Sequence, residues 1–191
     1  MCMKTLIFNG SPRKSGDTVC LISEMQKYLA GEIEIISSYY DNISPCFDCR
    51  YCWKNAGCCL DDDMQAVYAY IKECDNIIIA SPVYFSELTG SLLNIFSRLQ
   101  CFYTARYFIN KPVEQKSKNG VLILAAGGDG IHTKAESTAN TLFKFMNTKR
   151  VANVFSLNTN NIPASEDKQA VQSAHDAALL LTGLYQANIN L

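Results

Sequence analysis

Three stretches of this chain are apolar at successive positions, and they constrain the fold more than any other feature. These stretches are Lys4–Asn9, Asn76–Ala80 and Gly120–Ala126. Strands of this kind are buried on both faces, as they are in a parallel sheet that is covered by helices. Two further strands are expected at Glu32–Ser38 and Val151–Leu157, which gives five strands.

Segments with the periodicity of amphipathic helices alternate with these strands. The predicted helices span residues 18–30, 61–72, 92–100, 134–147 and 166–185, and the aspartates at 61–63 are expected to cap the second one. This alternation predicts an α/β fold, a doubly wound three-layer sandwich with a five-stranded parallel sheet in the order 2-1-3-4-5. Residues 1–191 are expected to form a single domain. Ligands of such domains bind beyond the carboxyl ends of the strands.

One connection in this scheme is long. The stretch Cys101–Lys118 lies between the third predicted helix and the fourth predicted strand, and it is rich in aromatic and charged residues. We expect it to be a loop that serves as a lid or an oligomer contact, or a disordered or merely variable connection.

The composition argues against several classes of partner. The chain has 17 basic and 18 acidic residues and no basic tract, so a nucleic-acid partner is not expected. No window approaches the roughly 20 apolar residues of a membrane span, and the N-terminal apolar run is too short for a signal peptide. We therefore expect a cytoplasmic protein, in which nine cysteines do not form a disulfide framework. Four cysteines stand alone and are expected to be small buried or half-buried hydrophobes: Cys2, Cys20, Cys74 and Cys101.

The other five cysteines form a compact run, and four of them have the spacing C-x2-C-x2-C-x5-C. The run consists of Cys46, Cys49, Cys52, Cys58 and the additional Cys59. Four thiols this close in sequence can converge on one centre, and soft thiolates select zinc, copper(I) or iron–sulfur clusters. The residue types alone leave the choice among these groups open.

The loop after the first strand has the composition of an anion site. Asn9–Thr18 offers the hydroxyls of Ser11, Ser15 and Thr18, the guanidinium of Arg13 and the free amides at the start of a helix. Helix N-terminal amides favour anions, and hydroxyls with an arginine fork add specificity for phosphate. Neither G-x-x-x-x-G-K-[ST] nor G-x-G-x-x-G occurs here, which disfavours nucleoside triphosphates and standard dinucleotides.

Three of the predicted strand-end loops carry a family resemblance. The loop Gly10–Thr18, Gly-Ser-Pro-Arg-Lys-Ser-Gly-Asp-Thr, resembles the phosphate loop of the flavodoxin-like NAD(P)H-dependent FMN reductases. The run Ala80–Gly90, with Ser-Pro-Val-Tyr, is similar to the second flavin loop of that family, and Ala126–Gly130 matches its glycine-rich third loop loosely. The resemblance implies a flavodoxin-like fold and FMN, with the FMN phosphate bound by Ser11, Arg13, Ser15 and Thr18.

The second and third loops agree with this resemblance residue by residue. Pro82 makes the chain turn at the strand end, which exposes the backbone of Val83 and the rings of Tyr84 and Phe85. A flat isoalloxazine ring can lie against such a surface. Gly127 and Gly128 permit a close approach of the backbone to the ring, whereas His132, just beyond them, is expected to be structural.

The cysteine run resembles the cluster motif of the iron–sulfur flavoproteins, a branch of the same superfamily. That resemblance implies a [4Fe–4S] cluster held by Cys46, Cys49, Cys52 and Cys58, with Cys59 leaving the fourth ligand open. Cluster-free relatives resemble the same pattern, so free or redox-active thiols and a zinc site stand as alternatives. The aromatic residues Phe47, Tyr51 and Trp53 are expected to shield the site from water or to form a subunit contact.

We therefore expect an FMN-dependent oxidoreductase that accepts a hydride from NADH or NADPH. The flavin supplies the chemistry, so the sequence nominates no catalytic acid or base. The expected partners are a nicotinamide donor, a small-molecule or protein electron acceptor, and further copies of the chain in a homodimer or homotetramer. The alternatives are a flavodoxin-like electron carrier without turnover and a redox sensor based on the cysteines.

Overall fold

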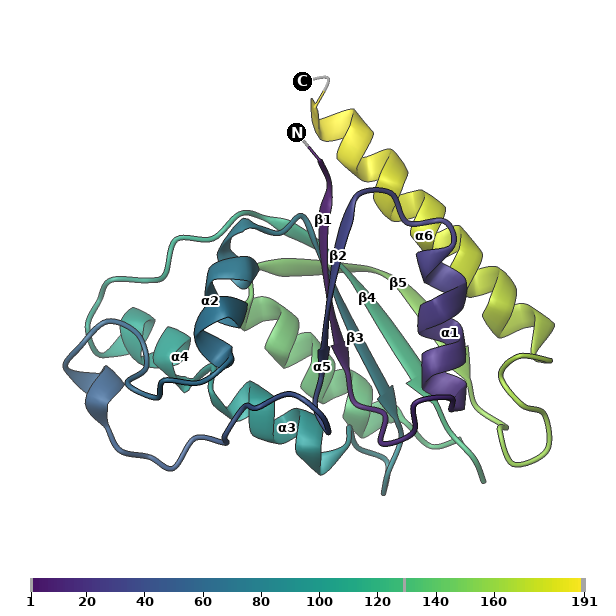
Figure 1. Cartoon of the computed structure of the whole chain (residues 1–191), viewed down its shortest axis with the longest axis horizontal. Helices are drawn as coiled ribbons and strands as arrows, with labels where there is room; N and C mark the ends of the chain where they lie inside the picture. The colour runs from purple at the N-terminus through teal and green to yellow at the C-terminus, as the bar shows by residue number, and fades with distance from the viewer. Residues whose placement is uncertain (1, 129, 190–191) are drawn as a thin grey trace.

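The computed structural model describes residues 2–128 and 130–189 of the chain. Its centre is a parallel sheet with the strand order β2-β1-β3-β4-β5 (Figure 1). The strands are β1 Lys4–Asn9, β2 Glu32–Ser37, β3 Asn76–Pro82, β4 Lys118–Ala125 and β5 Thr148–Ser156. The predicted number, direction and order of the strands are thus confirmed.

Helices cover both faces of the sheet. The helices are α1 Asp17–Gln26, α2 Met64–Glu73, α3 Gly90–Ser97, α4 Gln100–Tyr107, α5 Thr133–Phe145 and α6 Lys168–Ile189, and a short 3-10 turn, η1, spans Tyr51–Trp53. One core cluster joins α1 and α6 to one face, and a second joins α2, α3, α4 and α5 to the other (Figure 1). None of the helices in the described residues is long and apolar enough to cross a membrane.

The central strands are buried as their composition predicts, and the edge strands are not. Apart from residues at the strand ends and Asn119, β1, β3 and β4 are buried throughout, whereas β2 and β5 are each half-exposed. Edge strands lack a neighbour on one side, so they need fewer apolar residues. The strand ends are in register, because Asn9 pairs with Ala80, Pro82 with Ala125, and Ala125 with Ser156. This register brings the loops after the strands to one edge.

One predicted loop is in part a helix. The stretch 101–118 was expected to be irregular, but α4 occupies its first half and the first residue of β4 its end. The buried side chains of Cys101, Phe102 and Ala105 lie on one face of α4, while the exposed aromatic residues Tyr103 and Tyr107 hide that periodicity in the sequence. Most other predicted boundaries differ by a few residues, as helix ends commonly do.

Two smaller expectations are also corrected. Cys2 is exposed, not buried, whereas Cys74 and Cys101 are buried and Cys20 is partly buried. At the start of α2, Asp63 makes no capping bond, because its carboxylate accepts the backbone N–H of Asn42. Only Asp62 bonds an amide of that helix, the N–H of Met64, at 3.2 Å.

Candidate functional site

A cavity of about 190 Å³ opens at the carboxyl ends of the strands, and we call it the edge cavity. Its lining comes from the loops after β1, β3, β4 and β5. Of the residues that the sequence nominated for FMN, it contains Ser11, Arg13, Thr18, Pro82, Val83, Tyr84 and Gly127. The remaining lining residues are Pro12, Asp17, Ala125, Thr159 and Asn160. Three nominated residues are not part of the lining: Ser15, Phe85 and Gly128.

The first loop is rigid at one end and has free donors at the other. The Ser11 hydroxyl donates to the carbonyl of Arg13 at 2.9 Å and accepts its N–H at 3.2 Å, which closes a tight turn. Thr18 is buried in the first turn of α1, and its hydroxyl makes no hydrogen bond within the described residues. A free hydroxyl in the first turn of a helix, beside the N-terminal amides, is suited to an anion.

The guanidinium of Arg13 already has one partner in this loop. It donates to Asp17 at 2.9 Å, and the second carboxylate oxygen of Asp17 accepts the N–H of Ala164 at 3.0 Å. A guanidinium has five N–H donors, so an Arg13 held in this way still has donors for a ligand. Asp17 therefore orients Arg13 and ties the loop to the segment before α6.

Short contacts join the first and second loops. The N–H of Gly10 donates to Ala80 at 2.7 Å, and the Thr89 hydroxyl donates to the Gly10 carbonyl at 3.0 Å. A Cβ at Gly10 would lie 2.8 Å from the Thr89 hydroxyl and 3.0 Å from Leu92. Only glycine lets the two loops pack this closely.

The second loop ends in a tight hairpin turn with an exposed aromatic tip. Tyr84 and Glu87 exchange both backbone hydrogen bonds, at 2.9 and 3.0 Å. Between them, Phe85 has a φ of 52° and Ser86 a φ of 63°. Residues other than glycine seldom adopt this left-handed region. The Phe85 side chain is 100% exposed, and Tyr84 is 46% exposed. The turn is also pinned to α5, because Ala135 donates its N–H to the Ser86 carbonyl.

The third loop meets a segment that sequence reasoning missed. Thr159 and Asn160, after β5, line the edge cavity, and the N–H of Thr159 donates to Ala126 at 2.9 Å. A Cβ at Gly127 would lie 2.3 Å from the Asn160 side-chain oxygen, which explains a glycine there. The available signal was the polar run that follows the fifth strand, since its carboxyl end reaches the same edge. The predicted loop includes Asp129, which lies outside the described residues.

His132 is held in place by its neighbours. Its Nδ1 lies 2.6 Å from the Gly130 carbonyl and its Nε2 lies 3.2 Å from Glu136, while the ring packs edge-on against Phe155. These contacts agree with the expected structural role.

The five clustered cysteines line a second, smaller cavity of about 40 Å³, which we call the cysteine cavity. Arg98, Gln100 and Cys101 close it from the junction of α3 and α4. It shares no lining residue with the edge cavity. The loop leaves the carboxyl end of β2, but it then extends over α3 and α4 before it returns to α2 (Figure 1).

Within this loop, Cys49 and Cys59 are in contact. Their sulfur atoms lie 3.5 Å apart, and both residues are exposed. The backbone N–H of Tyr51 and the Cys59 thiol lower the pKa of Cys49, while the same contact raises the pKa of Cys59. Cys52 and Cys58 are instead half-buried and pack against the core.

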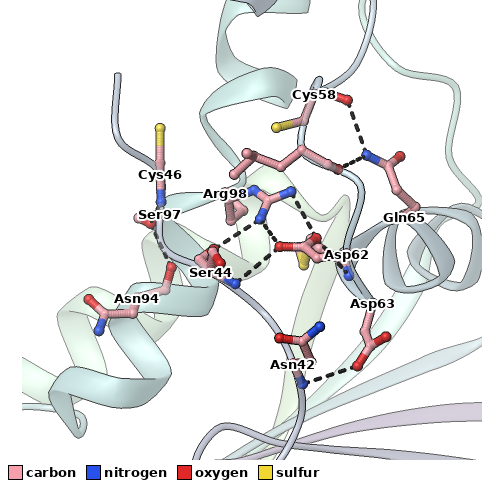
Figure 2. Close-up of polar contacts among 12 residues, drawn as sticks. Asn42, Ser44, Cys46, Cys58, Asp62, Asp63, Gln65, Asn94, Ser97 and Arg98 are labelled. Atoms are coloured by element: carbon pink, nitrogen blue, oxygen red, sulfur yellow. Dashed lines mark hydrogen bonds and ion pairs between the residues drawn. The ribbon is translucent and has the colours of Figure 1, made fainter. Parts of the chain in front are cut away.

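A buried ion pair holds the two ends of the cysteine loop together (Figure 2). The Arg98 guanidinium donates to both carboxylate oxygens of Asp62, at 2.6 and 3.1 Å. Asp62 also accepts the N–H of Ser44, whose carbonyl accepts a bond from Arg98 at 2.9 Å. Burial opposes ionisation of Asp62, but the bonds from Arg98 and the Ser44 amide outweigh it and lower its pKa.

Further contacts complete this support (Figure 2). The Ser97 hydroxyl accepts the N–H of Cys46 at 2.9 Å, and Gln65 donates to the Cys58 carbonyl at 3.1 Å. Trp53 stacks on Phe108 of the segment after α4, with ring centroids 4.8 Å apart. The aromatic residues of the loop are exposed, so they do not shield the cysteines from water in this chain alone.

The cysteine loop contains enough thiol groups to bind a metal centre, but these groups are not arranged in a metal-binding geometry. In the described part of the chain, no three or more cysteine, histidine or carboxylate side chains are grouped so as to hold a metal ion. All five loop cysteines nevertheless face one cavity, and none is tied up in a disulfide. Thiolates are the ligands that iron–sulfur clusters and zinc require, so the donor set fits either group.

The fold and the edge cavity define a doubly wound α/β protein with a cavity at the carboxyl ends of its strands. The chain belongs to the NADPH-dependent FMN reductase family, whose model matches residues 3–161. An iron–sulfur flavoprotein from Methanocaldococcus jannaschii is 34% identical over 99 residues, which are 50% of this chain and 51% of that protein. The matched segments span about half the length of the curated relatives that the chain matches first.

Solved structures agree on the fold. The NAD(P)H:quinone oxidoreductase from Methanothermobacter marburgensis has a TM-score of 0.71 at 17% identity, and the match covers 93% of this chain and 95% of that one. An FMN-dependent NADH-azoreductase from Bacillus anthracis, solved in complex with FMN, has a TM-score of 0.62 at 18% identity, over 94% of this chain and 99% of that one. At such identities the likeness shows the fold alone. The predicted flavodoxin-like architecture and family are confirmed.

Proposed function

We propose that this chain is a single-domain, FMN-dependent oxidoreductase that takes a hydride from NADH or NADPH and passes electrons to a separate acceptor. The observation that carries this proposal is the edge cavity, which is lined by Thr18 in the first turn of α1 and by the loop before it. Family membership and the FMN-bound azoreductase of the same fold support it.

In this proposal the FMN phosphate lies on the first loop. Thr18 and the amides at the start of α1 bind it, and Ser11 donates to it once its hydroxyl turns away from the Arg13 carbonyl. Arg13 adds its remaining donors, and Ser15 reaches it from the exposed side of the loop. The edge cavity is smaller than the roughly 300 Å³ at which cofactor pockets begin. The cavity therefore receives the phosphate end. The ring meets Tyr84 and Gly127 in the cavity lining and extends outside the cavity, against Phe85 and the backbone of Gly128.

Bound FMN supplies the hydride acceptor, and the residues of the chain bind and orient it. The backbone of Pro82 and Val83 is fixed by the bond from the Val83 N–H to Ala125, at 2.8 Å. This fixed backbone presents polar groups to one edge of the ring. No acid or base of the chain is required for the hydride transfer, in agreement with the absence of a nominated catalytic residue.

We further propose that the cysteine loop holds a [4Fe–4S] cluster through Cys46, Cys49, Cys52 and Cys58. The names of the iron–sulfur flavoprotein relatives and the six cysteines in the lining of the cysteine cavity support this assignment. Because Cys59 contacts Cys49, it is the alternative fourth ligand. Zinc on the same thiolates is the competing metal.

The contact between Cys49 and Cys59 also favours a second candidate function, a thiol-based redox sensor. Two thiols at 3.5 Å can form a disulfide when an external two-electron oxidant, such as a peroxide, removes two electrons and both protons leave. Thiol titration before and after oxidation tests this candidate. An unchanged thiol count would remove it.

The proposal includes a cytoplasmic location, where the nine cysteines remain reduced. It also includes a homodimer or homotetramer in which a neighbouring copy covers the exposed flavin ring. The acceptor is a small molecule or a redox protein, and neither nucleic acid nor a membrane is a partner.

Anaerobic purification followed by an absorbance spectrum and analysis of iron, sulfide and zinc tests the proposal. We expect a flavin band near 450 nm, a broad iron–sulfur absorbance, and oxidation of NADH or NADPH with an added acceptor. Protein that stays colourless after reconstitution with FMN, and that leaves flavin fluorescence unquenched, would refute the flavin site. Flavin with zinc, or with no metal, would refute only the cluster. Flavin reduction by another protein without nicotinamide turnover would favour an electron carrier.

A further inference from the structure

Arg98 is buried, and not all of its N–H groups have a partner in the described part of the chain. Its side chain has 0% exposure, and its Nη1 and Nη2 donate to Asp62 and to the Ser44 carbonyl. Its Nε has no hydrogen-bond partner among the described residues. An unpaired buried donor destabilises the folded state, and more so when the group is charged, so it calls for an explanation.

The position of Arg98 identifies what the missing acceptor is made of. Arg98 lines the cysteine cavity together with all five loop cysteines and Cys101. Burial alone would lower the pKa of Arg98, but Asp62, Tyr68 and Cys58 together raise it, so the Cys58 sulfur is within electrostatic range. Cys58 is half-buried and packs against the core. The lining of this cavity therefore offers six sulfur atoms as acceptors, beside the carboxylate of Asp48 and the side-chain amide of Gln100.

Separate contacts hold the backbone of Arg98 and its guanidinium. The Tyr68 hydroxyl donates to the Arg98 carbonyl at 2.8 Å, and the Cys101 thiol donates to the same carbonyl at 3.3 Å. Asp62 holds the far side of the guanidinium in a two-bond geometry. Because its guanidinium and its backbone are both held, the Nε–H of Arg98 has a fixed direction. An acceptor for it has to lie along that direction.

We propose that the Nε–H of Arg98 donates a hydrogen bond to a sulfur of the cluster that the cysteine loop binds, and that this bond raises the cluster's reduction potential. The inference rests on the proposed cluster and adds a residue to it. Reduction adds one electron and makes the sulfur atoms more negative, so a donor to sulfur stabilises the reduced state. Asp62 offsets the charge of Arg98, which leaves the directed N–H as the main effect.

The test compares the cluster potentials of Arg98→Lys and Arg50→Lys with that of the wild-type holoprotein by anaerobic redox titration. Lysine at 98 keeps a positive charge next to Asp62 but has no Nε–H. We expect its one-electron equilibrium to shift about tenfold toward the oxidised cluster, which is 59 mV to lower potential. Arg50 is the matched control, because it lines the same cavity but is exposed and lies over Trp53. The reduction potential of the cluster in Arg50→Lys should equal that of the wild type.

A second measurement avoids any variant that fails to fold. Wild-type protein grown with ¹⁵N-arginine is reduced, and pulsed electron paramagnetic resonance records nitrogen coupling to the cluster. We expect a ¹⁵N coupling that persists in labelled Arg50→Lys. Absence of that coupling overturns the inference, and so does an equal shift, or no shift, in the two lysine variants.

These outcomes separate the inference from the function on which it rests. A wild-type protein that binds FMN and iron, but shows neither the coupling nor the shift, overturns only the role of Arg98. A protein that binds no iron after reconstitution overturns the proposed cluster and the role of Arg98 together.

Discussion

The edge cavity and the cysteine cavity are built by different means. Around the edge cavity, backbone hydrogen bonds carry the sheet pattern past the strand ends, from Gly10 to Ala80, from Val83 to Ala125 and from Ala126 to Ser156. Around the cysteine cavity, side-chain bonds hold the loop in place, chiefly those between Asp62 and Arg98. The position of the first cavity therefore follows from the fold class. The position of the second depends on one buried ion pair.

Burial differs in the same sense. Ser11 and Thr18, at the edge cavity, are 3% and 2% exposed. In the cysteine loop, by contrast, Cys46, Cys49 and Cys59 are exposed. A loop with few buried contacts opens more easily than the elements that it connects. We therefore expect mutations in the ion pair to release the cysteine loop while the edge cavity keeps its structure.

The largest effect is expected for Asp62→Ala. It leaves Arg98 as an unpaired buried charge, which costs about 3–5 kcal/mol. Urea denaturation measures the loss, and limited proteolysis should show cleavage between residues 44 and 60 under native conditions. Asp63→Ala is the matched control, since the exposed Asp63 side chain accepts only one backbone bond, from Asn42, worth about 0.5–1.5 kcal/mol. Equal losses in the two variants would contradict the importance given to the ion pair.

The next effect is expected at the edge cavity, for Gly10→Ala. The added methyl group would meet Thr89, Leu92 and Ser81 at 2.8 to 3.1 Å. Overpacking of this kind costs about 1–3 kcal/mol, and it should also weaken FMN binding by separating the first two loops. Gly90→Ala is the control, because a Cβ there meets no atom within 4 Å. Titration of the apoprotein with FMN and urea denaturation measure both quantities. Unchanged FMN affinity in Gly10→Ala would show that FMN binding does not depend on the close contact between the first two loops.

The two regions also differ in how much of them the sequence predicts. Strand order and the nominated loops at the edge cavity follow from unbroken apolar strands and from the rule that ligands bind at their carboxyl ends. Seven of the nominated residues line that cavity. Thr159 and Asn160 were missed because their loop carries no recognisable motif, although its position after the fifth strand placed it at the same edge.

The support of the cysteine loop was out of reach of the sequence. Arg98 and Asp62 are 36 residues apart. The sequence marks Asp62 only as part of an aspartate run at a helix start, and Arg98 belongs to no motif. A charged residue near the end of a predicted amphipathic helix is normally exposed, so burial of Arg98 has no local signal. The sequence likewise did not predict α4. Its mixture of buried and exposed aromatic residues has no clear helical period, and the helix is recognised only from its packing on the core.

A smaller effect, with opposite signs for stability and binding, is expected at the tip of the second loop. Phe85 has a positive φ, which costs a residue with a side chain about 1–2 kcal/mol. Phe85→Gly should relieve part of this cost and raise stability by about 1 kcal/mol, yet weaken FMN binding through loss of the exposed ring. Ser86→Gly is the control, because it relieves a φ of 63° without removing an aromatic ring. If both variants bind FMN like the wild type, the Phe85 ring has no part in the site.

The smallest loss of stability is expected without any mutation, when the pH is lowered until the Asp62 carboxylate is partly protonated. Its folded-state pKa lies below that of the unfolded chain, because Arg98 and the Ser44 amide stabilise the carboxylate against burial. The unfolded chain therefore binds the proton first. The stabilisation is complete above the unfolded pKa of about 4 and is lost as the pH falls through the lower folded value.

The cysteine loop should then lose proteolytic protection at a higher pH than the sheet loses its circular dichroism. In Asp62→Asn, which cannot ionise, the acid-dependent step in loop protection should be absent, and protection should be low at every pH. An acid-dependent step that survives unchanged in Asp62→Asn would assign it to other carboxylates. The loop would then depend on its remaining contacts, those of Ser97 and Gln65, as the edge cavity depends on its backbone bonds.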